Sequence, residues 1–484
     1  MGRIIIFYRW RCEMIQFFQE CLFFFRGCFS RTATFQWFIV VMTGFVSRSD
    51  HFGVSSIIRG LLLTPKCYER LLHFFHSKAW DIDTLLNKWW HLVVKSGTPV
   101  QVNDKLILLA DHTKVSKEGR KMPGVSSLRQ DSETSSKPSF FRGHFWGTIS
   151  ILTGNTGTHF STPLWSSIHQ KLRLQGYTDP EETSTERIAN MAKTITDVIK
   201  KDAYLLLDSF FVSGYVFGIA GTSKNDKAGI TVITPAKSNT VGYELIAKKK
   251  RPQKRRGAPK KYGKPIKVAA KFNRYARRFT TGNAEVYGRK EVIRYYSKVL
   301  YWKPVKSNLL FVWAETSRGK IVLICSDVDE SAINVVELYC KRAKIETMFS
   351  TLKNIFGGHQ YHFWSMYQES QSRQPKKNDK EVKTSDIEKT METVEAIHRF
   401  FNLQSIVIGL MQMVSVKFPE TVVSESHLWL RTPSNNEPSE MLAKTAMKNI
   451  ISRCSIKLSK IHMIQIIRAK QNYGESDENW REAA

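Results

Sequence analysis

Two short apolar runs, each closed by an aspartate, constrain this chain more than any other feature of its sequence. Residues 105–111 read KLILLAD, and residues 203–208 read AYLLLD. Five consecutive apolar residues are typical of a strand that is buried on both faces of a sheet. In open α/β sheets, functional groups gather at the carboxyl ends of such strands. The sequence therefore predicts that Asp111 and Asp208 end two buried strands, and that their carboxylates converge if the strands are neighbours.

The surrounding segments extend this into a mixed α/β pattern. Strands are expected at residues 144–154, 160–168 and 230–234, and the capping box Thr183-x-x-Glu186 opens a helix between the second and third of them. The resulting order, β-β-β-α-β-α-β, is typical of a mixed sheet that carries helices on its faces.

A long helix is expected over residues 332–355. Tyr339, Arg342, Glu346 and Lys353 stand at offsets of 0, 3, 7 and 14, which fall on one face at 3.6 residues per turn. An apolar stripe beside this face would seat the helix on the sheet. A solvated helix with ordinary charge pairs explains the same pattern, and that alternative stays open.

The three acids suit a hard divalent cation. Two carboxylates at close range repel each other unless a cation lies between them, and Mg²⁺ prefers carboxylate oxygens. The sequence thus predicts Asp111, Asp208 and Glu346 as metal ligands and catalytic residues. Arg342 and Lys353 would meet phosphate instead, the first as a fork and the second as a point charge. The alternative is that each aspartate only begins a turn.

The charge of the chain favours a polyanionic partner. Lysine and arginine number 73 against 43 acids, a net charge of +30, and fifteen of these bases lie in residues 248–278 without any acid. Nucleic acid is the commonest partner of such a surface. The strongest DNA-binding candidates in this basic arm are Lys248, Lys249, Lys250, Arg251, Arg255 and Arg256.

The helix motif also carries a resemblance. Tyr339-x2-Arg342-x3-Glu346-x6-Lys353 resembles the YREK signature of one family of bacterial insertion-sequence DDE transposases, and the two strand-end aspartates match that family's first two catalytic acids. The resemblance covers roughly residues 100–365. It implies a ribonuclease-H-like catalytic core, interrupted by a mainly β insertion ahead of the helix that bears the glutamate.

For activity, the resemblance implies cut-and-paste movement of an insertion sequence. Two Mg²⁺ or Mn²⁺ ions would support phosphodiester hydrolysis and strand transfer. The partners would be double-stranded DNA, as terminal repeats and target, and a second copy of the chain. Two alternatives stay open, namely an inactive DNA-binding relic of a transposase and a nuclease of the same fold that hydrolyses without joining.

One family feature has no clear counterpart here. Members that form a DNA hairpin stack a flipped base on a tryptophan in the strand leading into the helix. That strand, residues 320–326, holds no tryptophan. Trp313 and Trp302 are the nearest candidates for this DNA contact, and either can instead be a core residue.

These features divide the chain into six expected segments. They are a helical N-terminal region with possible DNA-end binding (1–98), the first part of the core (99–237), the β insertion with its basic arm (238–330), the helix segment (331–365), a polar linker or loop (366–392) and a helical C-terminal region (393–484).

The cysteines and the first residues suggest a cellular setting. The seven cysteines are odd in number and form no Cys-x-x-Cys motif, which favours free thiols in a reducing cytoplasm. Charged residues interrupt every apolar run of the first 45 residues, so neither a membrane span nor a signal peptide is expected there. Met14 is an alternative start.

Overall fold

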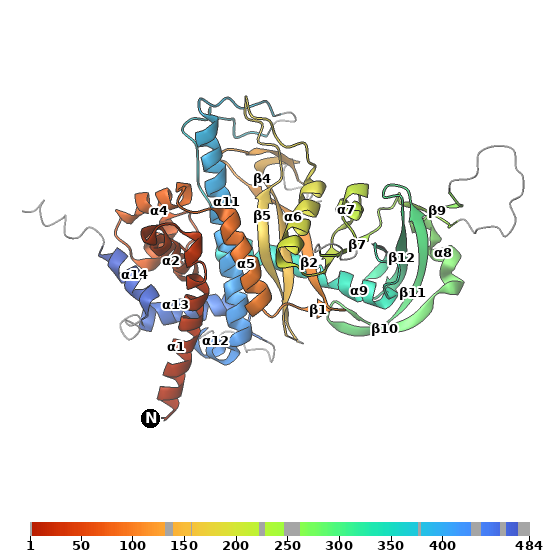
Figure 1. Cartoon of the computed structure of the whole chain (residues 1–484), viewed down its shortest axis with the longest axis horizontal. Helices are drawn as coiled ribbons and strands as arrows, with labels where there is room; N and C mark the ends of the chain where they lie inside the picture. Colours follow the sequence, from red (N-terminus) through yellow and green to blue (C-terminus); the bar gives the residue numbers. More distant parts are fainter. Residues whose placement is uncertain are drawn as a thin grey trace, which may run out of the picture. The chain divides into compact units, whose positions relative to one another are not determined.

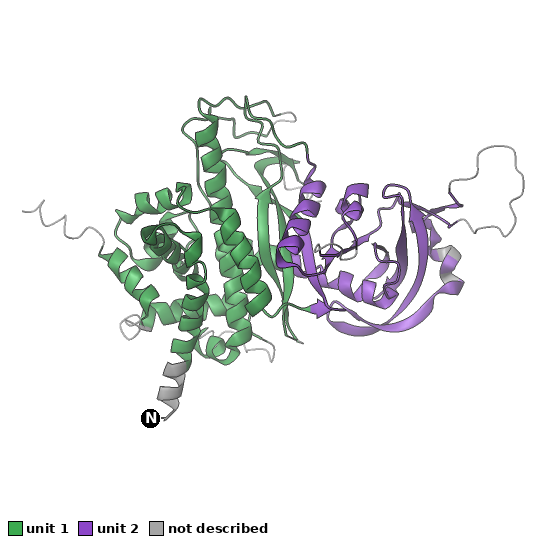
Figure 2. Ribbon diagram, in the orientation of Figure 1, with its two compact units in different colours: residues 1–100, 112–181, 347–484 green, residues 101–111, 182–346 purple. Residues whose placement is uncertain are grey.

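The structure, a computed structural model, describes residues 2–130, 139–155, 157–221, 228–245, 262–375, 379–426, 437–454 and 461–472. The chain divides into two compact units (Figure 2). Unit 1 comprises residues 1–100, 112–181 and 347–484, and unit 2 comprises residues 101–111 and 182–346.

Unit 2 is built on a mixed sheet. Its strands are β1 (Gln101–Val102), the first part of β2 (Lys105–Ser116), β6 (Ala203–Leu206), β7 (Ile230–Pro235), β8 (Val241–Tyr243), β9 (Pro265–Lys267), β10 (Thr280–Val286), β11 (Arg289–Trp302), β12 (Ser307–Thr316) and β13 (Gly319–Cys325). The order within this unit is β2-β6-β7-β13-β12-β11-β8-β9, with β1 beside β2 and β10 beside β11. Strands β2, β6 and β7 are parallel, and those from β13 onward are antiparallel.

The parallel strands are apolar because both of their faces are covered. Residues 106–110 of β2 and all four residues of β6 are buried, as expected for parallel strands. Helix α6 (Ser184–Ile199) opens with the predicted capping box of Thr183 and Glu186 and buries one apolar face. The remaining helices of unit 2 are η2 (Ser209–Phe211), α7 (Gly214–Gly218), η3 (Ala269–Lys271), α8 (Phe272–Tyr275), η4 (Ala276–Arg278), α9 (Ala332–Lys341) and the start of α10 (Lys344–Thr351).

Unit 1 is mainly helical. It contains α1 (Gly2–Phe23), η1 (Arg26–Cys28), α2 (Thr32–Ser47), α3 (Ser55–Leu61), α4 (Cys67–His76), α5 (Ile82–Ser96), η5 (Leu352–Phe356), α11 (Ile387–Lys417), α12 (Pro419–Ser426), α13 (Glu440–Cys454) and α14 (His462–Gln471). Its antiparallel strands are β3 (Ser126–Arg129), β4 (Phe140–Gly154) and β5 (His159–Ile168), and the end of β2 lies beside β4.

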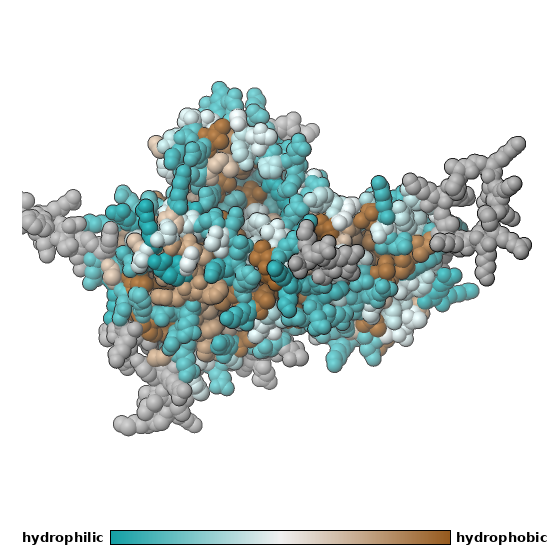
Figure 3. All heavy atoms as spheres, in the orientation of Figure 1, coloured by the Kyte–Doolittle hydropathy of each residue, from teal (hydrophilic) through white to brown (hydrophobic). Residues whose placement is uncertain are grey.

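Helix α11 is the core of unit 1. It packs against α2, α4, α5, α13 and β5, and Figure 1 shows it running alongside α5 and β5. It is long and apolar enough to cross a membrane, but 89% of its most apolar window is buried inside the protein, as in the core helix of a folded domain. Over the described surface seen in Figure 3, hydrophilic atoms predominate and hydrophobic ones form scattered patches.

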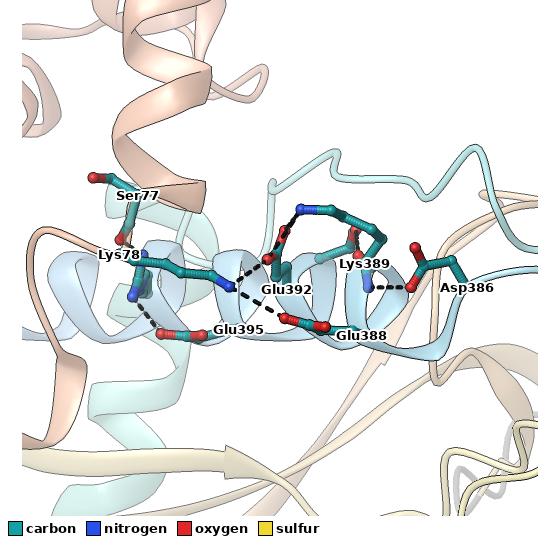
Figure 4. Close-up of polar contacts among 9 residues, drawn as sticks. Ser77, Lys78, Asp386, Glu388, Lys389, Glu392 and Glu395 are labelled. Atoms are coloured by element: carbon teal, nitrogen blue, oxygen red, sulfur yellow. Dashed lines mark hydrogen bonds and ion pairs between the residues drawn. The ribbon is translucent and has the colours of Figure 1, made fainter.

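A cluster of ion pairs joins the loop after α4 to the start of α11 (Figure 4). Lys78 lies 3.2 Å from Glu388 and 3.3 Å from Glu392, and Lys389 lies 3.0 Å from Glu392. About two turns further along α11, Arg399 is buried and donates to the carbonyls of Phe75, Ser77 and Trp80. That guanidinium ties the loop to the core helix.

The polar segment expected as a linker or loop contacts unit 1 at several points. Its Asp379 accepts hydrogen bonds from the backbone and hydroxyl of Ser127 and pairs with Arg142 at 3.4 Å. Val382 donates its N–H to the carbonyl of Arg173. These described residues are therefore held against β3 and β4 despite their polar composition.

Two predicted elements have different bounds in the structure. The strand expected to end at Asp111 continues to Ser116, because the residues after Asp111 enter unit 1 and lie beside β4. The single helix expected over residues 332–355 is broken. Helix α9 ends at Lys341 and α10 begins at Lys344, and the last turn, η5, is a π-helix.

Candidate active site

The two aspartates occupy equivalent positions on neighbouring parallel strands. The β2–β6 ladder pairs residues 106–109 with residues 203–206 and ends with Leu109 opposite Leu206. Asp111 and Asp208 each follow two residues later, so the shared register brings them to the same edge of unit 2. The strands are neighbours, as the prediction of converging carboxylates requires.

Asp208 is held at the start of a short helix. Its side chain accepts a hydrogen bond from the N–H of Ser209 and caps η2. The preceding residue, Leu207, donates its N–H to the carbonyl of Ile233 on β7. The chain thus leaves the sheet at Asp208, and one oxygen of its carboxylate accepts the capping hydrogen bond.

The helix break puts Arg342 at a tight turn between α9 and α10. The N–H of Arg342 donates to Tyr339 O at 3.0 Å, and the N–H of Ile345 donates to Arg342 O at 3.0 Å, so both bonds span three residues instead of four. This local tightening means that the four motif residues do not share one continuous helical face.

Arg342 connects two of the predicted catalytic acids. One terminal nitrogen lies 3.0 Å from Asp111 Oδ2, and the other lies 2.6 Å from Glu346 Oε1. The guanidinium is 13% exposed, Asp111 is 23% exposed and Glu346 is 61% exposed. The structure therefore links the glutamate of the helix to one strand-end aspartate, Asp111, through an arginine.

Electrostatic effects link the remaining members of the site. Burial by itself would lower the pKa of Arg342, but the charge of Asp111, followed by those of Tyr339, Asp208 and Glu346, raises it above its ordinary value. Burial raises the pKa of Tyr339 to about 12, with Arg342 opposing the rise and Asp208 adding to it. All three acids thus act on one guanidinium.

A hairpin tip that the sequence analysis did not single out lies beside this group. Tyr287 and Gly288, with φ of 50° and 80°, form the two-residue turn between β10 and β11. Burial raises the pKa of Tyr287, and Arg342 and Glu346 are among the charges that act on it. Arg318 lies over the Tyr287 ring at 5.3 Å. The only sequence signal was a Tyr-Gly pair between two strand-like runs, which is weak beside Asn-Gly or Asp-Gly.

The chemistry of the donor set suits a hard divalent cation, since all three acids offer oxygens. In this structure, however, the three carboxylates do not meet at a single point. Within the described residues, no group of three His, Cys, Asp or Glu side chains lies close enough to hold a metal ion. Asp111 and Glu346 instead share the guanidinium of Arg342.

The other predicted site residues lie in different settings. Lys353 belongs to unit 1, where it donates to the carbonyl of Lys114 at 3.4 Å. Trp313 is fully buried and Trp302 is 5% exposed. Both tryptophans are therefore core residues in this structure. Trp313 is not exposed for contact with DNA, because it is buried beside other aromatic rings.

The first part of the basic arm lies outside the described residues. This applies to Lys248, Lys249, Lys250, Arg251, Arg255 and Arg256. Six of the seven cysteines, Cys12, Cys21, Cys28, Cys67, Cys325 and Cys340, are free thiols, as expected from their spacing.

Part of the chain is similar to a known protein family. Residues 177–363 match the family model of the transposase DDE domain. The matched region contains Asp208, Arg342 and Glu346 and begins well after Asp111. Together with the mixed sheet and its flanking helices, this match confirms the predicted ribonuclease-H-like fold class. No curated protein matches the chain.

Proposed function

We propose that this chain is a DDE transposase that cuts and joins DNA ends with Asp111, Asp208 and Glu346. The observation that carries the proposal is the placement of two of these acids at one edge of the sheet, with the third joined to one of them by an arginine. Asp111 and Asp208 stand at the same register of two parallel strands, and Arg342 links Asp111 to Glu346. This group lies in a unit that overlaps the region similar to a transposase DDE domain.

The three carboxylates are the residues that would hold divalent metal, and we propose two Mg²⁺ or Mn²⁺ ions. Such ions, when bound, lower the pKa of an attacking water and stabilise the leaving oxygen of a phosphodiester. The protein's own contribution is to fix the acids at the ends of rigid strands and to present cations to the phosphates beside the scissile one. Among these cations we include Lys353 and the basic arm.

Membership of the YREK group of insertion-sequence transposases is part of the proposal. It rests on Tyr339, Arg342, Glu346 and Lys353 at their observed spacing. On this proposal the substrates are the terminal repeats of a mobile element and a target duplex. The active complex is a homodimer on DNA in the bacterial cytoplasm, because two element ends must be handled together.

A strand-transfer assay tests the proposal. A pre-cut DNA end with a free 3′-hydroxyl is incubated with supercoiled plasmid and Mg²⁺ or Mn²⁺, and joined products are counted. The wild type should join the end to the plasmid. Hydrolysis without joining would identify a nuclease of the same fold, and end binding without either reaction would identify an inactive relic.

Variants of the acids test the assignment of the site. Asp111→Asn, Asp208→Asn and Glu346→Gln should each abolish cleavage and joining, because each removes a carboxylate while preserving side-chain size. End binding in gel shifts should be retained, because cations hold the DNA. Glu315→Gln is the matched control, since Glu315 of β12 pairs with Arg294 on the neighbouring strand β11. Near-normal cleavage by any of the three variants would remove that residue from the site.

A further inference from the structure

Arg342 binds one oxygen of each of two carboxylates that a metal ion in this site would need. Its two terminal nitrogens donate to Asp111 Oδ2 at 3.0 Å and to Glu346 Oε1 at 2.6 Å. An arginine side chain has five donors and no acceptor, so it can pair with carboxylates but cannot ligate a metal. A guanidinium and a divalent cation are two positive charges that the same two acids would attract, and at close range these two charges repel each other.

The site also shows why a cation is retained there. Carboxylates brought together repel each other, and the repulsion grows as they leave bulk water. The charges of Asp111, Asp208 and Glu346 all act on Arg342, which is only 13% exposed. A permanently charged guanidinium offsets that repulsion.

We propose that Arg342 competes with divalent metal for Asp111 and Glu346, so that metal binding requires the guanidinium to release Glu346. This inference rests on the proposed function, since it assumes that the acids are metal ligands. Release at Glu346 follows from exposure, because Glu346 is 61% exposed and Asp111 only 23%. An ion pair near solvent is the weaker of the two.

Metal binding without DNA tests the competition directly. Mn²⁺ affinity is measured by electron paramagnetic resonance or isothermal titration calorimetry on the full chain. Arg342→Gln should bind Mn²⁺ about tenfold more tightly than wild type, because one positive charge a few ångströms from the ion is removed. Arg342→Lys keeps the charge and should remain close to wild type. Equal or weaker binding by Arg342→Gln would overturn the proposal and show that the arginine arranges the acids for the metal.

Arg318→Gln is the matched control. Arg318 lies over Tyr287, the hairpin residue on which Arg342 and Glu346 also act, but Arg318 forms no ion pair with the three acids among the described residues. The Arg318→Gln variant loses one nearby positive charge but releases no carboxylate from an ion pair. Its affinity for Mn²⁺ should therefore change less than twofold. A gain equal to that of Arg342→Gln would show a general charge effect and overturn direct competition.

Thermal unfolding gives a second readout that needs no activity. In EDTA, Arg342→Gln should unfold at a lower temperature than wild type, because its acids lose their cation. Added Mn²⁺ should raise its midpoint by more than it raises that of wild type. Equal Mn²⁺ shifts in the two proteins would contradict the proposal.

A measurement on the wild type covers the case in which the variant does not fold. Phenylglyoxal labelling of Arg342, read by peptide mass spectrometry, should increase when Mn²⁺ is added, with Arg318 as internal reference. Unchanged labelling at saturating Mn²⁺ would overturn the proposal. If Asp208→Asn and Glu346→Gln bind Mn²⁺ as well as wild type, the proposed function itself fails. If they lose binding while Arg342→Gln matches wild type, only the competition fails.

Discussion

The role of a single side chain in unit 2 depends on its surroundings more than on its residue type. Trp313 is fully buried, and its indole N–H donates to the carbonyl of Val268 at 2.9 Å. The rings of Tyr275 and Tyr296 lie 5.5 Å and 5.7 Å from it. These contacts stabilise the β insertion, since a buried indole with a satisfied N–H combines a large apolar surface with a hydrogen bond.

Trp313→Phe tests this role. The substitution leaves the Val268 carbonyl without its donor and removes buried volume, so it should lower the free energy of unfolding by about 1–3 kcal/mol. Affinity for element-end DNA should not change. Trp364→Phe is the control, because Trp364 is 65% exposed and should tolerate the same change. A loss of DNA affinity without a loss of thermal stability would reverse the interpretation.

At the scale of elements, buried cations fasten chain segments in unit 1 by binding carbonyl groups. Arg399 of α11 donates to one carbonyl in the last turn of α4 and to two in the loop that follows, and it lies over the Trp80 ring at 4.4 Å. Its pKa is lowered by burial, an effect that Glu395 opposes. Lys78 contacts the same helix from the surface, where its side chain is 75% exposed. The two cations join the same elements in very different environments.

Arg399→Met should therefore destabilise the protein far more than Lys78→Met. Loss of the guanidinium leaves buried carbonyls unpaired, which costs about 1–3 kcal/mol for each group. An exposed ion pair contributes little, because water screens it. Thermal unfolding monitored by circular dichroism should show a midpoint several degrees lower for Arg399→Met and unchanged for Lys78→Met. Equal shifts would mean that the surface cluster, and not the buried arginine, holds the loop.

At the scale of the whole molecule, two buried lysines couple stability to pH. Lys117 donates to the carbonyls of His359 and Tyr361, and Lys444 donates to the carbonyl of Ile355. Burial lowers the pKa of Lys117 to about 7 and that of Lys444 to about 7. Between pH 7 and the ordinary lysine pKa of 10.5, the unfolded chain therefore binds more protons than the folded protein at both positions.

Stability should consequently rise from pH 7 to pH 8.5. The linkage slope is at most about 1.4 kcal/mol per pH unit for each lysine, and the contribution is flat below pH 7, where both states are protonated. The thermal midpoint of wild type should increase over this range, and the increase should be smaller in Lys117→Met and Lys444→Met. Lys95→Met is a surface control. A wild-type midpoint that falls over this range would contradict the lowered pKa values.

The basic arm carries a prediction for DNA binding by the whole chain. Replacing Lys248, Lys249, Lys250 and Arg251 with glutamine should flatten the slope of log affinity against log salt by about 3–4, because fewer counterions are released from DNA. Preference for element-end sequence should change little, since phosphate contacts carry no sequence information. An unchanged slope would show that these bases do not contact DNA.

The sequence alone determined the strands that carry the acids. Five apolar residues before Asp111 and before Asp208 are typical of a strand buried on both faces, and the interior of a parallel sheet with covered faces provides that burial here. The capping box at Thr183 is an equally local signal, and helix α6 begins there as expected. Patterns of this kind are readable because they depend on a few neighbouring residues.

The tertiary structure decided how these elements meet. Helical periodicity placed Tyr339, Arg342, Glu346 and Lys353 on one face, but the tight turn at Arg342 breaks the helix and turns the guanidinium to Asp111, 231 positions away in the chain. The burial of Trp313 and the continuation of β2 past Asp111 into unit 1 also depend on contacts between distant parts of the chain. Contacts between distant residues depend on the packing of whole elements, which local periodicity does not record.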